Sequence, residues 1–218
     1  MKYYLDITLL PDADINLGFL WHKVYLQIHL MLVEHKVSDK DSAIALAFPK
    51  YDTTPFPLGD KLRLFAETEQ RLADLKVAQW LVRFEDYVHI KGIKAVPGNI
   101  TEYAYFRRWH FKSPDKLRES VDSRAAYIAR KNGFVVDEVK ARLLASIDNY
   151  KTESMLPYIN LRSLSTDKHL SPVERKKFLL FIECRKVSEP DDNPWLFNCY
   201  GLSRRSDDAQ AAVPWFDG

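Results

Sequence analysis

The sequence predicts an α+β protein whose first hundred residues follow the order β-α-β-β-α-β. Short runs in which apolar and polar residues alternate predict strands, and longer runs with apolar residues at helical spacing predict helices. Pro and Gly clusters separate these runs. In this order of elements, antiparallel strands bury one face against two helices, an arrangement called ferredoxin-like.

The elements of this first domain, which we place at residues 1–98, follow from local patterns. Residues 3–10 alternate as a strand that ends at Pro11, and Asn16 is a suitable N-cap for a helix over 17–35. The apolar residues of this helix, which recur at helical spacing, are Leu17, Leu20, Trp21, Val24, Ile28 and Met31. The remaining elements are a strand over 44–48, a strand over 61–66, a helix over 67–79 and a strand over 84–93.

Residues 99–218 have a different character and form a second predicted domain, with a basic helix and a small β-sheet. The segment 103–109 is aromatic and basic. Ser113 as N-cap and Pro114 in the first turn start a helix that continues to Asn132 and Gly133. A second helix follows over 136–147, and the last strand-like segments are 158–164, 178–183 and 196–200.

Positive charge is concentrated at the start of the second domain. Residues 107–131 hold eight basic and three acidic side chains, a net charge of +5, whereas the whole chain carries +2. The basic residues are Arg107, Arg108, Lys112, Lys116, Arg118, Arg124, Arg130 and Lys131. Such a stretch indicates a polyanionic partner, and the alternative is a solvated helix face with local ion pairs.

Several classes of protein are disfavoured by what the sequence lacks. No apolar run approaches the roughly 18 residues of a membrane span, and Asp6 interrupts any signal-peptide core, so we expect a cytoplasmic protein. The two cysteines have no zinc-ligand spacing, and nucleotide-binding and two-metal motifs are missing. The third strand also lacks the stacking aromatic residues of RNA recognition motif domains.

A few residues have side chains suited to catalysis or to binding a ligand. His29 and His22 share one face of the first helix, but seven residues correspond to about 10.5 Å of helix rise, too far for both to bind one ion. A histidine accepts a proton near neutral pH, although one on an apolar helix is more often structural. Ser163 and Ser165 project from one face of an extended segment and can bind a phosphate or a ribose hydroxyl, or simply begin a polar turn. Tyr200 can pack, stack or donate a hydrogen bond.

Taken together, short motifs from both ends of the chain resemble the repeat-processing endoribonucleases of type I-F CRISPR systems, the Csy-type family. Residues 66–160 match that family only in character. The matching motifs, in family order, are Tyr4-Leu5-Asp6-Ile7 with Pro11-Asp12, His29, Ala47-Phe48-Pro49, Leu58-Gly59 with Lys61-Leu62-Arg63, Leu161-Arg162-Ser163 with Ser165-Thr166, Phe178 with Phe181-Ile182, Cys199-Tyr200-Gly201-Leu202-Ser203, and Val213-Pro214-Trp215-Phe216.

The resemblance implies cleavage of a CRISPR repeat hairpin at the 3′ base of its stem, by a 2′-hydroxyl and without a metal ion or other cofactor. By this resemblance, His29 takes the hydroxyl proton, Ser163 holds that hydroxyl and Ser165 lies near the phosphate. Tyr200 orients the histidine, and Phe178 stacks at the base of the stem.

The same resemblance implies that the basic helix enters the major groove of the hairpin. Arg108 and His110 align with base-reading positions, although the family commonly has Gln at the second. The other candidate RNA contacts are Lys112, Lys116, Arg118, Arg124, Arg130 and Lys131. Implied partners are the repeat RNA before and after cleavage and the other subunits of the type I-F surveillance complex. The alternatives are a non-catalytic RNA-hairpin-binding subunit of that complex and a metabolite-binding ferredoxin-like domain.

Overall fold

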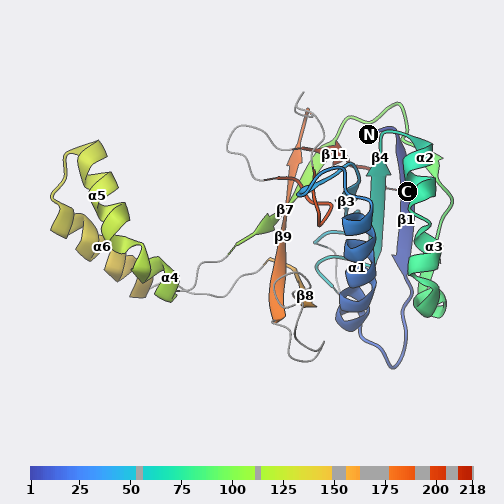
Figure 1. Ribbon diagram of the computed structural model, residues 1–218, viewed down its shortest axis with the longest axis horizontal. Coiled ribbons are helices and arrows are strands. Elements are labelled where there is room, and N and C mark those ends of the chain that lie inside the picture. The colour runs from blue at the N-terminus through green and yellow to red at the C-terminus, as the bar shows by residue number, and fades with distance from the viewer. Residues whose placement is uncertain are drawn as a thin grey trace. The chain divides into compact units, whose positions relative to one another are not determined.

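The computed structural model describes residues 1–52, 56–110, 114–148, 156–162, 177–189, 197–204 and 211–217, which divide into two units (Figure 1). One unit combines Met1–Trp109 with Leu156–Gly218, and the other is His110–Met155. Within the larger unit, residues from both sides of position 98 contribute to one hydrophobic core. The boundary between residues 98 and 99 stays a prediction.

The first sheet has the strand order β3-β4-β1-β5, with antiparallel neighbours throughout. This is the strand order of a ferredoxin-like domain, in which the first helix connects β1 to β3 and β4 lies between them. The predicted α+β fold is therefore confirmed. The bounds are Tyr3–Leu9 for β1, Leu17–Glu34 for α1, Ala45–Ala47 for β3, Lys61–Ala66 for β4 and Val88–Ile90 for β5.

Helix α1 forms as predicted and packs its apolar stripe against this sheet (Figure 1). The side chain of Asn16 accepts a hydrogen bond from the backbone N–H of Phe19 at 2.8 Å, which caps the helix. The stripe residues Leu20, Trp21, Val24, Ile28 and Met31 are buried, and they anchor the helix in the core.

The second half of this domain departs from the predictions in two places. The predicted helix over 67–79 is broken into α2 (Glu69–Asp74) and α3 (Val77–Trp80), because Lys76 adopts a left-handed backbone with φ of 48°. The predicted strand over 84–93 is wrong outside 88–90, since residues 82–87 form the 3₁₀ helix η1 (Val82–Tyr87). If β5 began earlier in the same register, residue 86 would pair with Pro11. Proline has no backbone N–H to donate to a neighbouring strand, so the pairing ends before this point. The short strand β6 (Lys94–Ala95) pairs with β1.

A second sheet, with the order β11-β7-β9-β8, completes the larger unit. Its strands are β7 (Tyr103–Trp109), β8 (Tyr158–Arg162), β9 (Lys177–Val187) and β11 (Val213–Pro214). The short strands β2 (Asp41–Ser42) and β10 (Phe197–Asn198) pair with each other. Buried residues of the second sheet, such as Phe106 and Leu180, pack in the same core as those of α1.

One buried ion pair ties the first sheet to the C-terminal segment. The guanidinium of Arg63 donates to both carboxylate oxygens of Asp6, at 2.6 and 3.0 Å, and to the carbonyl of Phe216 at 2.9 Å. Its planar group also lies over the rings of Tyr4 and Phe216, 4.5 and 4.0 Å from their centroids. Both charged side chains are almost fully buried, and Nζ of Lys61 lies 3.9 Å from the same carboxylate. Asp6 therefore supplies the buried guanidinium with its counter-charge.

The smaller unit is helical and consists of α4 (Pro114–Glu119), α5 (Val121–Asn132) and α6 (Val136–Asp148). The single helix predicted up to Asn132 is interrupted at Ser120, whose hydroxyl donates to the carbonyl of Leu117 and whose backbone leaves the helical region. Gly133 ends α5 with φ of 72°, as predicted for a C-terminal glycine. Small residues, Ala125 and Ala129, pack against Val139.

Within the described part of the chain, no helix combines the length and the apolar character that crossing a membrane requires.

Candidate active site

The imidazole of His29 lies on the flank of α1, beside the buried stripe rather than within it. The helix presents His29 half-buried to the loop that follows β10. The Nδ1 atom of His29 is 2.9 Å from the carbonyl oxygen of Cys199 in that loop. Because a carbonyl can only accept, Nδ1 carries the proton, which leaves a free lone pair on Nε2 of the neutral ring.

The loop that meets His29 has a conformation set by Asn198 and Gly201. The side-chain oxygen of Asn198 accepts from the backbone N–H of Tyr200 at 2.8 Å and of Leu202 at 3.2 Å, which closes a tight turn. Gly201 has φ of 70°, and a Cβ there would lie 2.4 Å from Cγ of Leu46. Only glycine fits this position, so the sequence of the loop determines where Tyr200 lies.

The ring of Tyr200 stacks on the His29 imidazole. The two rings are 6° from parallel and their centroids are 4.4 Å apart. The hydroxyl of Tyr25, one turn before His29 on α1, donates to the carbonyl of Tyr200 at 2.9 Å. Burial raises the pKa of Tyr25 well above its usual value, so this hydroxyl keeps its proton. Helix α1 therefore holds two successive carbonyls of the loop, those of Cys199 and Tyr200.

Burial is the main cause that lowers the pKa of His29 from its ordinary value. The hydrogen bond to the Cys199 carbonyl raises the pKa, and the positive charge of Arg108 lowers it further. The net direction is downward, so the ring is neutral at neutral pH. A neutral imidazole with one free nitrogen is the form that accepts a proton in general-base catalysis.

Arg108 and Phe178 continue the row of stacked side chains beyond Tyr200. The guanidinium carbon of Arg108 is 5.4 Å from the centroid of Tyr200 and 5.1 Å from that of Phe178. Its Nε atom is buried, with no hydrogen-bond partner among the described residues. The pairing of β7 with β9 brings these two strands together, with Arg108 opposite Ile182. The site therefore combines an imidazole, two aromatic rings and a cation.

Some predicted site residues fall outside the described residues. These are Ser163, Ser165 and Lys112, and their assigned roles stay predictions. Strand β8 ends at Arg162, immediately before the first of the serines, and Leu161 pairs with Phe178 of β9. Nδ1 of His22 contacts the carbonyl of Asn160, which fastens this strand to α1.

The predicted RNA contacts of the helical unit have different environments. Arg118 donates to Asp148 at 2.8 Å and lies 3.5 Å from Asp115, so it takes part in ion pairs within the helical unit. The side chains of Arg124, Arg130 and Lys131 are exposed, and no ion pair to them occurs among the described residues. Lys116 and His110 are exposed as well. Seven residues separate Arg124 from Lys131 on α5, which places both on one stripe.

Two contributors to the site were not predicted from the sequence, Tyr25 and the carbonyl of Cys199. The position of Tyr25, four residues before His29, places it on the same helix face and is the signal that could have identified it. A backbone carbonyl gives no such signal, because every residue has one.

The fold and this row of side chains define a ferredoxin-like protein with a histidine-centred candidate active site. The chain belongs to the family described as CRISPR-associated protein (Cas_Csy4), whose model matches residues 4–216. The resemblance inferred from the motifs is thereby confirmed.

Two curated relatives match along their full length. One is the CRISPR-associated endonuclease Cas6/Csy4 of Pseudomonas aeruginosa (strain UCBPP-PA14), 29% identical over 217 residues and covering 99% of this chain and 100% of the relative. The other has the same name, comes from Escherichia coli (strain UTI89 / UPEC) and is 29% identical over 219 residues, with the same coverage. A solved structure described as "An RAMP protein binding different RNA substrates" aligns over 98% of this chain and 99% of its own with 12% identity and a TM-score of 0.29, too weak a likeness to compare.

Proposed function

We propose that this protein is an endoribonuclease that processes CRISPR RNA by cutting the repeat hairpin at the 3′ base of its stem, without a metal ion. Family membership and the names of the two relatives support the activity. The observation that carries the mechanism is the His29 imidazole, whose Nδ1 proton is engaged by Cys199 and whose Nε2 is left to act as a base.

In the proposed reaction, Nε2 of His29 takes the proton of the 2′-hydroxyl upstream of the scissile phosphate. The 2′-oxygen forms a new bond to phosphorus while the bond from phosphorus to the 5′-oxygen breaks. The products are a 2′,3′-cyclic phosphate and a 5′-hydroxyl, because the leaving 5′-oxygen takes a proton from water and the imidazolium of His29 then returns its proton to the solvent. An attack within one nucleotide depends on alignment and on one proton acceptor, and His29 provides the acceptor.

The other side chains of the site hold the RNA in the proposed complex. Tyr200 keeps the imidazole oriented through its stacked ring, and Phe178 stacks on the last base pair of the stem. Arg108, with its planar cation beside both rings, binds a base edge or a phosphate. Ser163 holds the 2′-hydroxyl and Ser165 lies near the phosphate, as the family motif implies.

The helical unit binds the hairpin in this proposal, with Arg124 and Lys131 facing the RNA from one stripe of α5. Their exposed charges are suited to phosphate contacts, which dominate affinity for nucleic acids. After cleavage the protein stays on the mature RNA and becomes a subunit of the type I-F surveillance complex in the cytoplasm.

The test is a gel assay with the repeat RNA of the host locus under single-turnover conditions. The proposal predicts cleavage at the 3′ base of the stem, equal rates with and without EDTA, and no product from a substrate with a 2′-deoxy nucleotide upstream of the scissile phosphate. Strict dependence on Mg²⁺ would contradict the metal-free mechanism. Tight binding of the hairpin without any cleavage would instead establish the non-catalytic RNA-binding subunit.

A further inference from the structure

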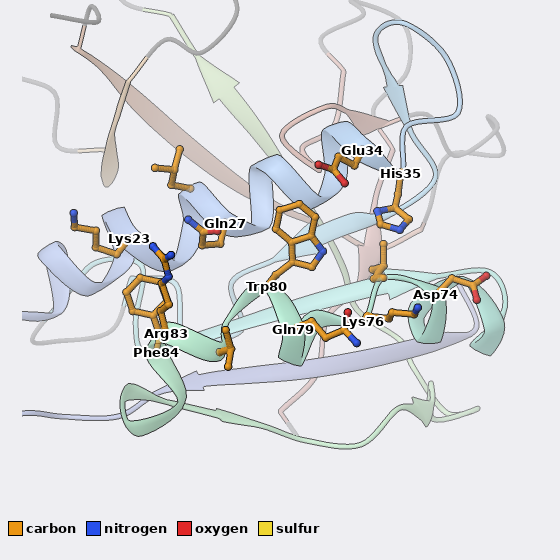
Figure 2. Close-up of a pocket in the computed structure, with 13 residues that line it drawn as sticks. Lys23, Gln27, Glu34, His35, Asp74, Lys76, Gln79, Trp80, Arg83 and Phe84 are labelled. Atoms are coloured by element: carbon orange, nitrogen blue, oxygen red, sulfur yellow. The ribbon is translucent and has the colours of Figure 1, made fainter. Parts of the chain in front are cut away.

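A groove of about 820 Å³ lies between α1 and the segment formed by α2, α3 and η1 (Figure 2). On α1 its lining includes Lys23 and Glu34, which lie about 120–140° around the helix axis from His29. The groove and the candidate active site therefore use different flanks of the same helix. A ligand in one leaves the other accessible.

The length of the groove matches a short helix. Lys23 and Glu34 are eleven residues apart on α1, a rise of about 16 Å, which corresponds to about three turns of an α-helix. The opposite wall exists because the left-handed backbone at Lys76 separates α2 from α3 and turns the chain. Side chains on helical walls form ridges and grooves into which the side chains of a further helix can pack.

The middle of the groove is apolar. Leu26 and the buried Leu75 line it, together with the half-buried rings of Trp80 and Phe84. Figure 2 shows Trp80 between the two walls at the centre of the groove. Tryptophan is enriched among the residues that contribute most of the binding energy of protein interfaces, and such residues cluster near the centre of the interface.

Charges of different sign lie at the two ends. Lys23 and Arg83 lie toward one end of the groove, whereas Glu34, Asp74 and Lys76 lie toward the other (Figure 2). Because a helix carries partial positive charge at its N-terminus and partial negative charge at its C-terminus, this distribution fits one direction of a bound helix. Its C-terminus would lie at Lys23 and Arg83, antiparallel to α1. The two carboxylates and the apolar centre disfavour a nucleic-acid strand.

We infer that this groove binds an amphipathic α-helix of another protein, about three turns long and antiparallel to α1, with an apolar face on Trp80 and acidic residues near its C-terminus. The inference goes beyond RNA cleavage and does not depend on it. The groove would make the protein a scaffold that attaches to a protein partner by one flank of α1 while the other flank holds RNA.

The test places a photo-crosslinking benzophenone amino acid at Gln79, which lines the groove, in the full chain expressed in its host. The matched control carries the same group at Ala78, an exposed neighbour on α3 that does not line the groove. We expect irradiation to give a crosslink from residue 79 but not from residue 78, to a peptide with an amphipathic helical pattern. The double variant Lys23→Glu with Arg83→Glu should abolish it, and changing the acidic residues of that peptide to lysine should restore it.

Every other result overturns the inference. A crosslink to RNA would assign the groove to the nucleic acid, one to a second copy of this chain would make it a self-association surface, and one to a non-helical peptide would contradict the proposed ligand. No crosslink in cells that contain processed CRISPR RNA would also overturn it. Hairpin cleavage by the Lys23→Glu, Arg83→Glu variant is measured separately and is expected to equal that of the parent, so a failure here is distinct from a failure of the proposed function.

Discussion

Replacing Gly201 with alanine tests whether the loop after β10 sets the position of the His29 imidazole. The added Cβ would lie 2.4 Å from Cγ of Leu46 and 3.1 Å from Cδ1 of Leu32. Carbon atoms in contact are about 3.5 Å apart, so the loop has to move by about 1 Å. The backbone angle φ of +70° adds roughly 1–2 kcal/mol of strain for a residue with a Cβ.

A movement of this size reaches the proposed base, His29, because the loop contacts its ring directly. The carbonyl of Cys199 binds Nδ1 of His29, and the ring of Tyr200 stacks on the imidazole. Misplacing a catalytic group by about 1 Å reduces a rate by about 100-fold. We therefore expect Gly201→Ala to lower single-turnover cleavage by about 100-fold and the free energy of unfolding by about 2–5 kcal/mol, with little change in hairpin affinity.

The assay is single-turnover cleavage of the repeat hairpin at a temperature where a thermal melt shows the variant folded. The matched control is Gly133→Ala, because Gly133 has nearly the same φ of 72° but no atom within 4 Å of an added Cβ. The control should lose about 1–2 kcal/mol through backbone strain and keep its cleavage rate. A folded Gly201→Ala variant that cleaves as fast as the parent would refute the positioning role of the loop.

Three further predictions concern other parts of the molecule. Asp6→Asn leaves Arg63 buried without its counter-charge and should lower the free energy of unfolding by about 3–5 kcal/mol in denaturant titrations; an unchanged midpoint would show that this pair is dispensable. Arg124→Ala should weaken hairpin binding and reduce the slope of log affinity against log salt by about 1, whereas an unchanged slope would remove this residue from the interface. Arg108→Gln removes a positive charge that lowers the pKa of His29, so the acidic limb of the cleavage profile should move to higher pH; a shift to lower pH would contradict this coupling.

Local patterns predicted most of the ferredoxin-like domain. The apolar stripe of α1 and its Asn16 cap gave the helix within one residue at its C-terminal end, because both signals lie within the segment itself. The breaks at Lys76 and Ser120 were missed, since a lysine or a serine fits a continuous helix as well as a broken one. The residues before Val88 were wrongly predicted as strand because their pairing depends on where Pro11 ends the partner strand.

For the candidate site as well, the sequence identifies single residues but does not show which of them lie together. The family resemblance indicated His29, Tyr200, Arg108 and Phe178 one at a time, but their stacking joins residues up to 171 positions apart, which no local pattern can reveal. The direction in which the pKa of His29 moves also depends on burial by the folded chain. The predicted family motif therefore supplied the residue identities, and the structure supplied their arrangement.

If the neutral imidazole of His29 acts as the base, the cleavage rate depends on pH through the protonation of this one ring. Single-turnover rates of the parent and of His29→Ala are measured between about pH 5 and about pH 8. The base must be unprotonated, so the parent rate should rise about tenfold per pH unit and level off below the usual histidine pKa of about 6.5. The variant should be at least about 100-fold slower on the plateau and should lack this limb, yet bind the hairpin normally. Equal rates, or an acidic limb that persists in the variant, would contradict the assignment.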